Sequence, residues 1–120
     1  MDFTVNTTHQ SCVYLKMNRI EKLQEYLKAQ PEDPFLQHAL ALEYSKAGDS
    51  VQAVAIFIRL LQQNPQYVGS YYHLAALLVQ EKKIGEAIEW YEKGMEAAKK
   101  SGDTHALNEL RAAYDDLMDV

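Results

Sequence analysis

The chain has 120 residues and a formal net charge of −5, so it has no general electrostatic attraction to nucleic acid or to an anionic membrane. Its 48% apolar and 24% charged content is that of one ordinary globular domain, and no apolar stretch approaches the 18 residues of a transmembrane helix. The single cysteine, Cys12, excludes an intramolecular disulfide and fits a reducing compartment, so we expect a cytoplasmic protein.

The first periodic pattern begins only after Met17, so a start of translation at Met17 is an alternative to one at Met1. Residues 1–17 show neither helical spacing nor the apolar run of a signal peptide, and we predict a flexible N-terminal extension there. Ile20, Leu23 and Leu27 then form an apolar stripe at helical spacing, which predicts a helix over residues 18–30. Pro31 ends that helix, because the residue before a proline disfavours helical geometry.

The next two helices carry their own start and stop signals. Asp33 is a predicted N-cap and Pro34 a first helical residue, so a helix runs from there to about residue 47. Gly48 ends it in the left-handed conformation. Ser50 is the predicted cap of a helix that continues to about residue 63, where Asn64 and a proline break it.

Three further helices follow. The first spans about residues 68–81, and the second spans about residues 85–100 and is closed by Gly102. Asp103 or Thr104 caps the last helix, which ends near residue 118. Because no segment alternates with period two, we expect an all-α protein without a sheet.

The chain matches itself at an offset of 34 residues. Apolar, small and proline positions recur together: Pro31 with Pro65, Leu40 with Leu74, Ala41 with Ala75, Ala53 with Ala87, Phe57 with Tyr91. A period of this length indicates stacked helical units, which offer a binding surface more often than a catalytic pocket. The alanines are small enough for paired helices to approach closely.

This pattern resembles the tetratricopeptide repeat family, in which each 34-residue unit is a helix A, a tight turn and a helix B. The matching residues include Leu40, Ala41, Tyr44, Gly48, Ala53, Phe57, Pro65, Tyr71, Leu74, Ala75, Ala87 and Tyr91. The resemblance implies a right-handed α-α superhelix over residues 18–118, with full units at 34–67 and 68–103. A half-repeat helix at 18–30 and a capping helix at 104–118 would complete its ends. The departures are Gln37 for the large aromatic residue, Lys82 for the turn glycine and Gly94 for the small alanine.

The resemblance also implies a function, because helix A residues line the concave face on which this family binds peptides. The corresponding residues here are Phe35, His38, Leu42, Ser45, Lys46, Gly69, Tyr72, Ala76, Val79 and Gln80. We therefore expect an adaptor or scaffold for an unidentified protein or peptide, with His38 titrating between about pH 6 and 7. In the alternative interpretation these side chains pack partly under neighbouring helices. A further alternative function is that of a self-associating structural protein, a homodimer through exposed apolar helix faces. We expect a monomer or a weak homodimer.

Some members of the family grip acidic chaperone tails with a clamp of lysine, asparagine and arginine. The corresponding positions here are His38, Leu42, His73, His105 and Glu109, which cannot form that clamp, since glutamate repels a carboxylate. The four histidines lack zinc-ligand spacing, and no phosphate loop or nucleophile motif is present. We therefore expect no metal, no cofactor and no enzymatic activity. Trp90 falls over Ile56 in the repeat, which favours a half-buried structural position.

Overall fold

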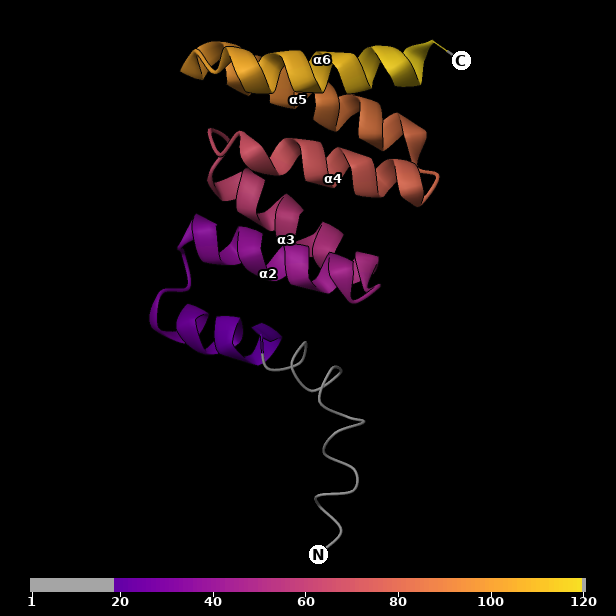
Figure 1. Cartoon of the computed structure of the whole chain (residues 1–120). Helices are drawn as coiled ribbons and strands as arrows, with labels where there is room; N and C mark the ends of the chain where they lie inside the picture. The colour runs from indigo at the N-terminus through magenta and orange to yellow at the C-terminus, as the bar shows by residue number, and fades with distance from the viewer. Residues whose placement is uncertain (1–18, 120) are drawn as a thin grey trace, which may run out of the picture.

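The computed structural model describes residues 19–119, so the predicted extension at 1–17 and its Cys12 lie outside the described residues. Within that range the chain forms six helices and no strand, which confirms the all-α prediction. The first helix occupies residues 19–29. The others are α2 (Pro34–Lys46), α3 (Ser50–Gln63), α4 (Gly69–Gln80), α5 (Ile84–Ser101) and α6 (Thr104–Met118) (Figure 1).

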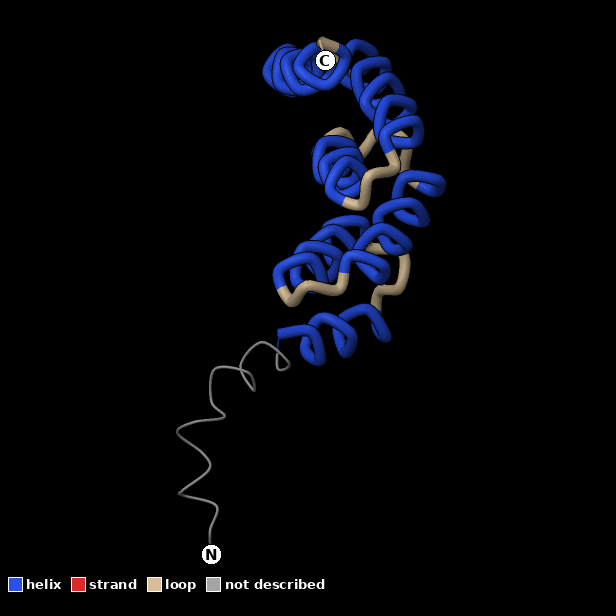
Figure 2. Tube along the Cα trace, turned by 90° about the vertical axis from the view of Figure 1, so that its right-hand side faces the viewer, coloured by secondary structure: helices blue, strands red, loops and turns tan. Residues whose placement is uncertain are grey.

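The helices stack one after another along the molecule, as in a helical-repeat solenoid (Figure 1). Seen from the side, the stack curves into a C shape (Figure 2). Helices α2, α4 and α6 lie on the inner side of the curve, and α3 and α5 lie on its outer side (Figure 2). The inner helices therefore form one continuous face, which we call the concave face.

The core lies where consecutive helices cross. Ala41, Ala53, Ala75 and Ala87 are completely buried there, as the paired small residues predict. Larger apolar side chains fill the space around them, among them Phe57, Leu60, Leu74, Leu78 and Leu110. Each buried leucine contributes roughly 1.5–3 kcal/mol relative to an exposed one, so this row of contacts holds the stack together.

The structure confirms some helix caps and corrects one. The Asp33 carboxylate accepts hydrogen bonds from the amides of the first turn of α2, as predicted, and Asp103 caps α6. The prediction that Ser50 caps α3 is wrong. Asp49 is the N-cap, because it lies directly before the first helical residue and its Oδ1 accepts from the Gln52 amide at 3.2 Å. The Ser50 hydroxyl instead donates to Glu81 Oε2 at 2.7 Å and ties α3 to the residue after α4.

The turns between paired helices share one backbone conformation. Gly48 ends the turn after α2 with a φ of 87°, as predicted. Lys82 lies one period later and has a φ of 64°, in the left-handed region that is unfavourable for residues other than glycine. The family's turn geometry is therefore kept at Lys82 without the residue that suits it best.

Gly94 lies where α4, α5 and α6 come together. A Cβ at this position would be 2.7 Å from the Cβ of Tyr71 and 3.1 Å from Leu110 Cδ1. Glycine fits here because Tyr71 of α4 and Leu110 of α6 leave no room for the Cβ of the family's alanine.

Candidate functional site on the concave face

Two hollows open on the concave face, and His38 lines both. The first has a volume of about 440 Å³ between α2, α4 and α6, and we call it the inner hollow. Its walls are His38, Val68, Gly69, Tyr72, His73, Ala106, Glu109 and Leu110. The second, of about 650 Å³, lies toward the start of α4 and is lined by His38, Gln66, Tyr67, Val68, Gly69, Ser101 and Asp103.

His38 is held firmly at the junction of the two hollows. Its Nδ1 lies 2.7 Å from the Ser70 hydroxyl, and its ring packs edge-on against Phe57 at a centroid distance of 5.5 Å. The His73 ring lies 5.4 Å away on the next inner helix. Burial lowers the pKa of His38, and the neighbouring His73 lowers it further. The predicted titration between about pH 6 and 7 therefore moves to lower pH.

His73 forms the opposite wall of the inner hollow. Burial lowers its pKa too, although the carboxylate of Glu109 across the hollow acts in the other direction. Both imidazoles are therefore neutral near pH 7, and Glu109 is the charged group of this hollow. Such a site suits apolar, neutral or basic groups of a partner and disfavours carboxylates.

Two aromatic side chains of the predicted site remain available to a partner. Phe35, at the start of α2, is 66% exposed, and Tyr72 on α4 is 41% exposed. The Tyr72 ring stands edge-on to Tyr91 at a centroid distance of 6.3 Å, and this contact fixes its orientation. Tyr72 therefore presents a positioned aromatic surface at the edge of the inner hollow.

The structure brings together only part of the predicted set. His38, Gly69 and Tyr72 line the hollows. Leu42 and Val79 are half-buried against the core, and Lys46 forms an ion pair with Glu43 at 3.6 Å. The remaining members lie outside the two hollows, with Ser45 half-buried and Phe35, Ala76 and Gln80 exposed.

Sequence reasoning missed the contribution of α6 to this site. The inner hollow is lined by four residues outside the predicted set: Val68, His73, Ala106 and Glu109. From the sequence, His73 and Glu109 were considered only as positions of the carboxylate clamp that this chain lacks. One signal was available: His38 and His73 are 35 residues apart, which places them at adjacent positions of successive units. Neighbouring inner helices then bring the two rings together.

The described residues offer little for other kinds of site. Between residues 19 and 119, no three His, Cys, Asp or Glu side chains form a group that could hold a metal ion. None of the helices in this range combines the length and the apolar character needed to cross a membrane. The two hollows of the concave face are therefore lined chiefly by aromatic rings, neutral imidazoles and carboxylates.

Comparison with known proteins agrees with this architecture. The tetratricopeptide repeat family model matches residues 44–114. A crystal structure of a tetratricopeptide repeat domain protein from Salinibacter ruber is 36% identical, with a TM-score of 0.70, and the match covers 73% of this chain and 98% of that one. A solution structure of a tetratricopeptide repeat domain protein from the same organism is 39% identical, also with a TM-score of 0.70, over 72% of this chain and 88% of that one.

A more distant structure shares the fold over nearly the whole chain. The TPR2B domain of yeast Sti1, solved in a complex with pHsp70, has a TM-score of 0.80 at 16% identity. That match covers 97% of this chain and 93% of the other. A search of curated protein sequences found no match.

Proposed function

The chain belongs to the tetratricopeptide repeat family, and from this premise we propose that it is an adaptor or scaffold that binds a peptide or partner protein through its concave face. Domains of this family are typically interaction modules without catalytic activity, and we propose the same for this chain. We also place it in the cytoplasm as part of this proposal, since a lone cysteine suits a reducing compartment.

The observation that carries this proposal is the exposure of Tyr72 at the edge of the inner hollow, together with that of Phe35 at the start of α2. Aromatic side chains that lose their hydration at an interface commonly dominate its binding energy. Tyr72 is already oriented by Tyr91, so little conformational freedom would be lost when a partner covers it. The inner hollow beside it, at about 440 Å³, has room for one or two side chains of a bound segment.

The charges of the hollow narrow the class of partner. The yeast Sti1 domain, which shares only the fold, was solved with a protein-derived partner, and this supports a protein or peptide as the occupant here. A clamp for an acidic chaperone tail does not fit, since His38 is half-buried, Leu42 is apolar and Glu109 is a carboxylate. We propose a segment with apolar and neutral or basic side chains.

The test is a paired substitution with a matched control. Phe35→Ala with Tyr72→Ala removes both exposed rings of the face. Tyr26→Ala with Val51→Ala removes an aromatic and an aliphatic side chain, 57% and 77% exposed, from outside the predicted set. Capture of partners from native lysate should be lost in the first variant and kept in the second, with helical circular dichroism unchanged in both. Equal capture by both variants would contradict the proposal.

Self-association is the second candidate function, because several large apolar side chains are exposed, including Val51, Ile84 and Met118. Such residues favour a homodimer only if they form a contiguous patch. Sedimentation velocity over a wide range of concentration distinguishes the two functions. If the chain is a monomer at every concentration, the homodimer is excluded. If the chain forms a dimer and the variant with Phe35→Ala and Tyr72→Ala does not, a second copy of the chain, and not a peptide, occupies the concave face.

A further inference from the structure

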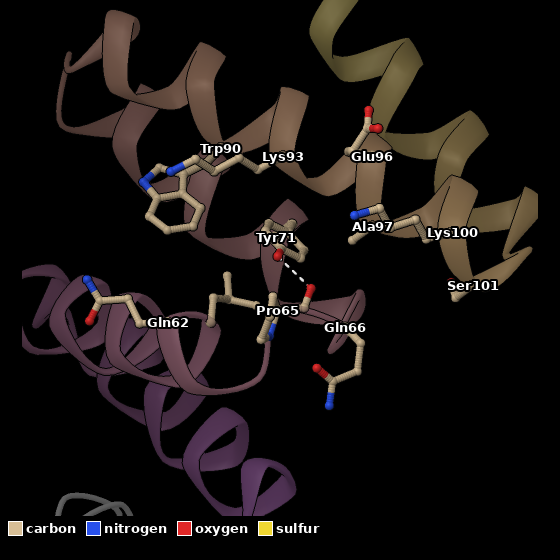
Figure 3. A pocket seen from close by; sticks show the side chains of 11 residues that line it. Gln62, Pro65, Gln66, Tyr71, Trp90, Lys93, Glu96, Ala97, Lys100 and Ser101 are labelled. Atoms are coloured by element: carbon tan, nitrogen blue, oxygen red, sulfur yellow. Dashed lines mark hydrogen bonds between the residues drawn. The ribbon is translucent and has the colours of Figure 1, made fainter.

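A third hollow lies away from the concave face, between the end of α3, the turn after it and α5 (Figure 3). Its volume is about 560 Å³, larger than that of the inner hollow. We call it the Trp90 groove and define it by Pro65, Tyr71, Trp90, Ala97, Lys93 and Lys100. Tyr71 and Tyr72 are consecutive on α4, so one ring lines this groove and the next lines the concave face.

The apolar walls of the Trp90 groove are fixed in place. The Tyr71 hydroxyl donates a hydrogen bond to the Pro65 carbonyl at 2.6 Å, and this bond anchors the ring to the turn (Figure 3). The Trp90 ring lies beside it, with 6.1 Å between the centroids and 41° between the planes. Because these rings are already held, a bound side chain would meet a surface that needs little ordering.

The groove is flanked by two lysines of α5. Lys93 Nζ lies over the Trp90 ring, 4.5 Å from its centroid, and Lys100 is two helical turns further along the same helix. Neither lysine forms an ion pair with another residue of the described range. Glu96 also lines the groove between these lysines, but its carboxylate points away from Tyr71 and Pro65 (Figure 3). The groove is thus locally basic on a chain of net charge −5.

Only the tryptophan of this pair is particular to the second unit, because Tyr71 occupies the family's large aromatic position. One period earlier, Gln37 stands in the place of Tyr71 and Ile56 in the place of Trp90, and α2 and α3 still pack. Trp90 therefore adds a large aromatic ring where the preceding unit packs with an isoleucine. Aromatic rings beside unpaired cations are suited to a ligand that is both apolar and anionic.

We propose that the Trp90 groove is a second binding site, for an acidic segment of a partner protein that carries a large apolar side chain. The apolar side chain packs on Tyr71 and Trp90, and the carboxylates that flank it pair with Lys93 and Lys100. This site is separate from the concave face, whose two hollows carry the carboxylates of Glu109 and Asp103. The two surfaces therefore select segments of different charge.

The experiment uses the full chain and a blocked hexapeptide, acetyl-Glu-Asp-Phe-Leu-Asp-Glu-amide, as the probe. Trp90 is the only tryptophan of the chain, so its fluorescence reports on this groove alone when the probe contains none. We expect a saturable change in that fluorescence. In two-dimensional nuclear magnetic resonance spectra, the largest shifts should fall on Leu61, Ala97 and their neighbours and not on His73 or Ala106.

Lys100→Glu and Lys99→Glu form a matched pair, because both lysines are exposed in the last turn of α5 and only Lys100 lines the groove. Lys100→Glu should weaken binding of the probe by about threefold to tenfold, and Lys99→Glu by less than about twofold. Trp90→Leu should weaken it by at least roughly fivefold, read by resonance shifts.

Five results would each overturn the proposal. The probe produces no shifts at millimolar concentration, or it shifts the concave face instead. A charge-reversed probe, acetyl-Lys-Arg-Phe-Leu-Arg-Lys-amide, binds as well as the acidic one. Lys99→Glu and Lys100→Glu weaken binding equally. Lys100→Glu abolishes a self-association of the chain, which would make a second copy the occupant.

Discussion

Gln37 and Tyr71 stand at the same position of successive units, and each donates a hydrogen bond to the carbonyl of the proline six residues before it. The Gln37 Nε2 reaches the Pro31 carbonyl at 2.8 Å, and the Tyr71 hydroxyl reaches the Pro65 carbonyl at 2.6 Å. The hydrogen bond between the helix and the preceding turn is therefore present in both units, although the first unit has Gln37 in place of the family's aromatic residue. The replacement has a cost, because Gln37 is only 7% exposed and its Oε1 has no hydrogen-bond partner.

This relationship predicts opposite results at the two positions. Gln37→Met removes a buried oxygen without a partner together with one hydrogen bond, so the free energy of unfolding should stay the same or rise by up to about 1 kcal/mol. Tyr71→Phe removes only the hydrogen bond and should lower it by about 1 kcal/mol. Urea unfolding measures both values. A loss of more than about 1 kcal/mol in Gln37→Met would show that its hydrogen bond outweighs the unpaired oxygen.

Gly94→Ala should destabilise the stack, although alanine is the better helix former. The added Cβ would meet the Cβ of Tyr71 at 2.7 Å, and moving α4 from α5 should cost about 1–3 kcal/mol. Gly85→Ala is the control, since nothing lies within 4 Å of its added Cβ and it should not destabilise. Equal melting temperatures for the two variants would mean that the three helices can separate without cost.

Lys82→Gly should raise the free energy of unfolding by about 1 kcal/mol, because glycine adopts a φ of 64° without the steric cost that a side chain adds. Lys83→Gly removes the same charge at the next residue, whose φ is −97°, and should bring no gain. Thermal unfolding of the two variants gives the comparison. A loss of stability in Lys82→Gly would indicate that the lysine side chain stabilises this turn by another route.

The histidines of the concave face predict a loss of stability in acid. The folded state lowers the pKa values of His38 and His73 below 6.5, so the unfolded chain binds protons more readily. The stabilisation from the neutral histidines is fully present above the pKa of the unfolded chain. It is lost as the pH falls from about 6.5 toward the pKa values of the folded state. Urea unfolding between about pH 7.5 and about pH 5.5 measures this slope.

His38→Gln should make that slope shallower, because it removes one of the two imidazoles whose pKa is lowered. The other groups that face the pair are Ser70, Tyr67, Tyr72 and Glu109, and the variant retains them. The same slope in wild type and His38→Gln would assign the acid sensitivity to other groups.

Removal of α6 tests whether it closes the stack. Leu110 is 1% exposed and packs beside Gly94, so deletion from Thr104 onward uncovers the face of α5 that carries Gly94 and Ala98. The truncated chain should associate or melt at a lower temperature, because each lost buried leucine represents roughly 1.5–3 kcal/mol. A monomer with the melting temperature of the full chain would show that α6 is not a cap.

The helices and the positions where they cross could be predicted from the sequence, because they depend on local signals. Ala41, Ala53 and the proline breaks recur with the period, and each position carries its own steric requirement. The cap of α3 was misplaced by one residue, since adjacent Asp49 and Ser50 both have capping side chains and only the backbone geometry separates them.

The surfaces were harder to predict, because each is assembled from several helices. The inner hollow depends on α6 meeting α2 and α4 across the curve, and the Trp90 groove depends on a turn, an inner helix and an outer helix together. Trp90 is half-buried, as its place in the repeat suggests. Its exposed part could be assigned to a groove only once Pro65 and Tyr71 were placed beside it.

The most direct test of the proposed function is site-specific photocrosslinking in intact cells, with a photoreactive amino acid at Ala76 or at Val51. Both positions are exposed, Ala76 on the inner helix α4 and Val51 on the outer helix α3. We expect a crosslinked partner from position 76, lost when Phe35 and Tyr72 are changed to alanine, and none from position 51. The same partner crosslinked from position 51 and not from 76 would contradict binding at the concave face.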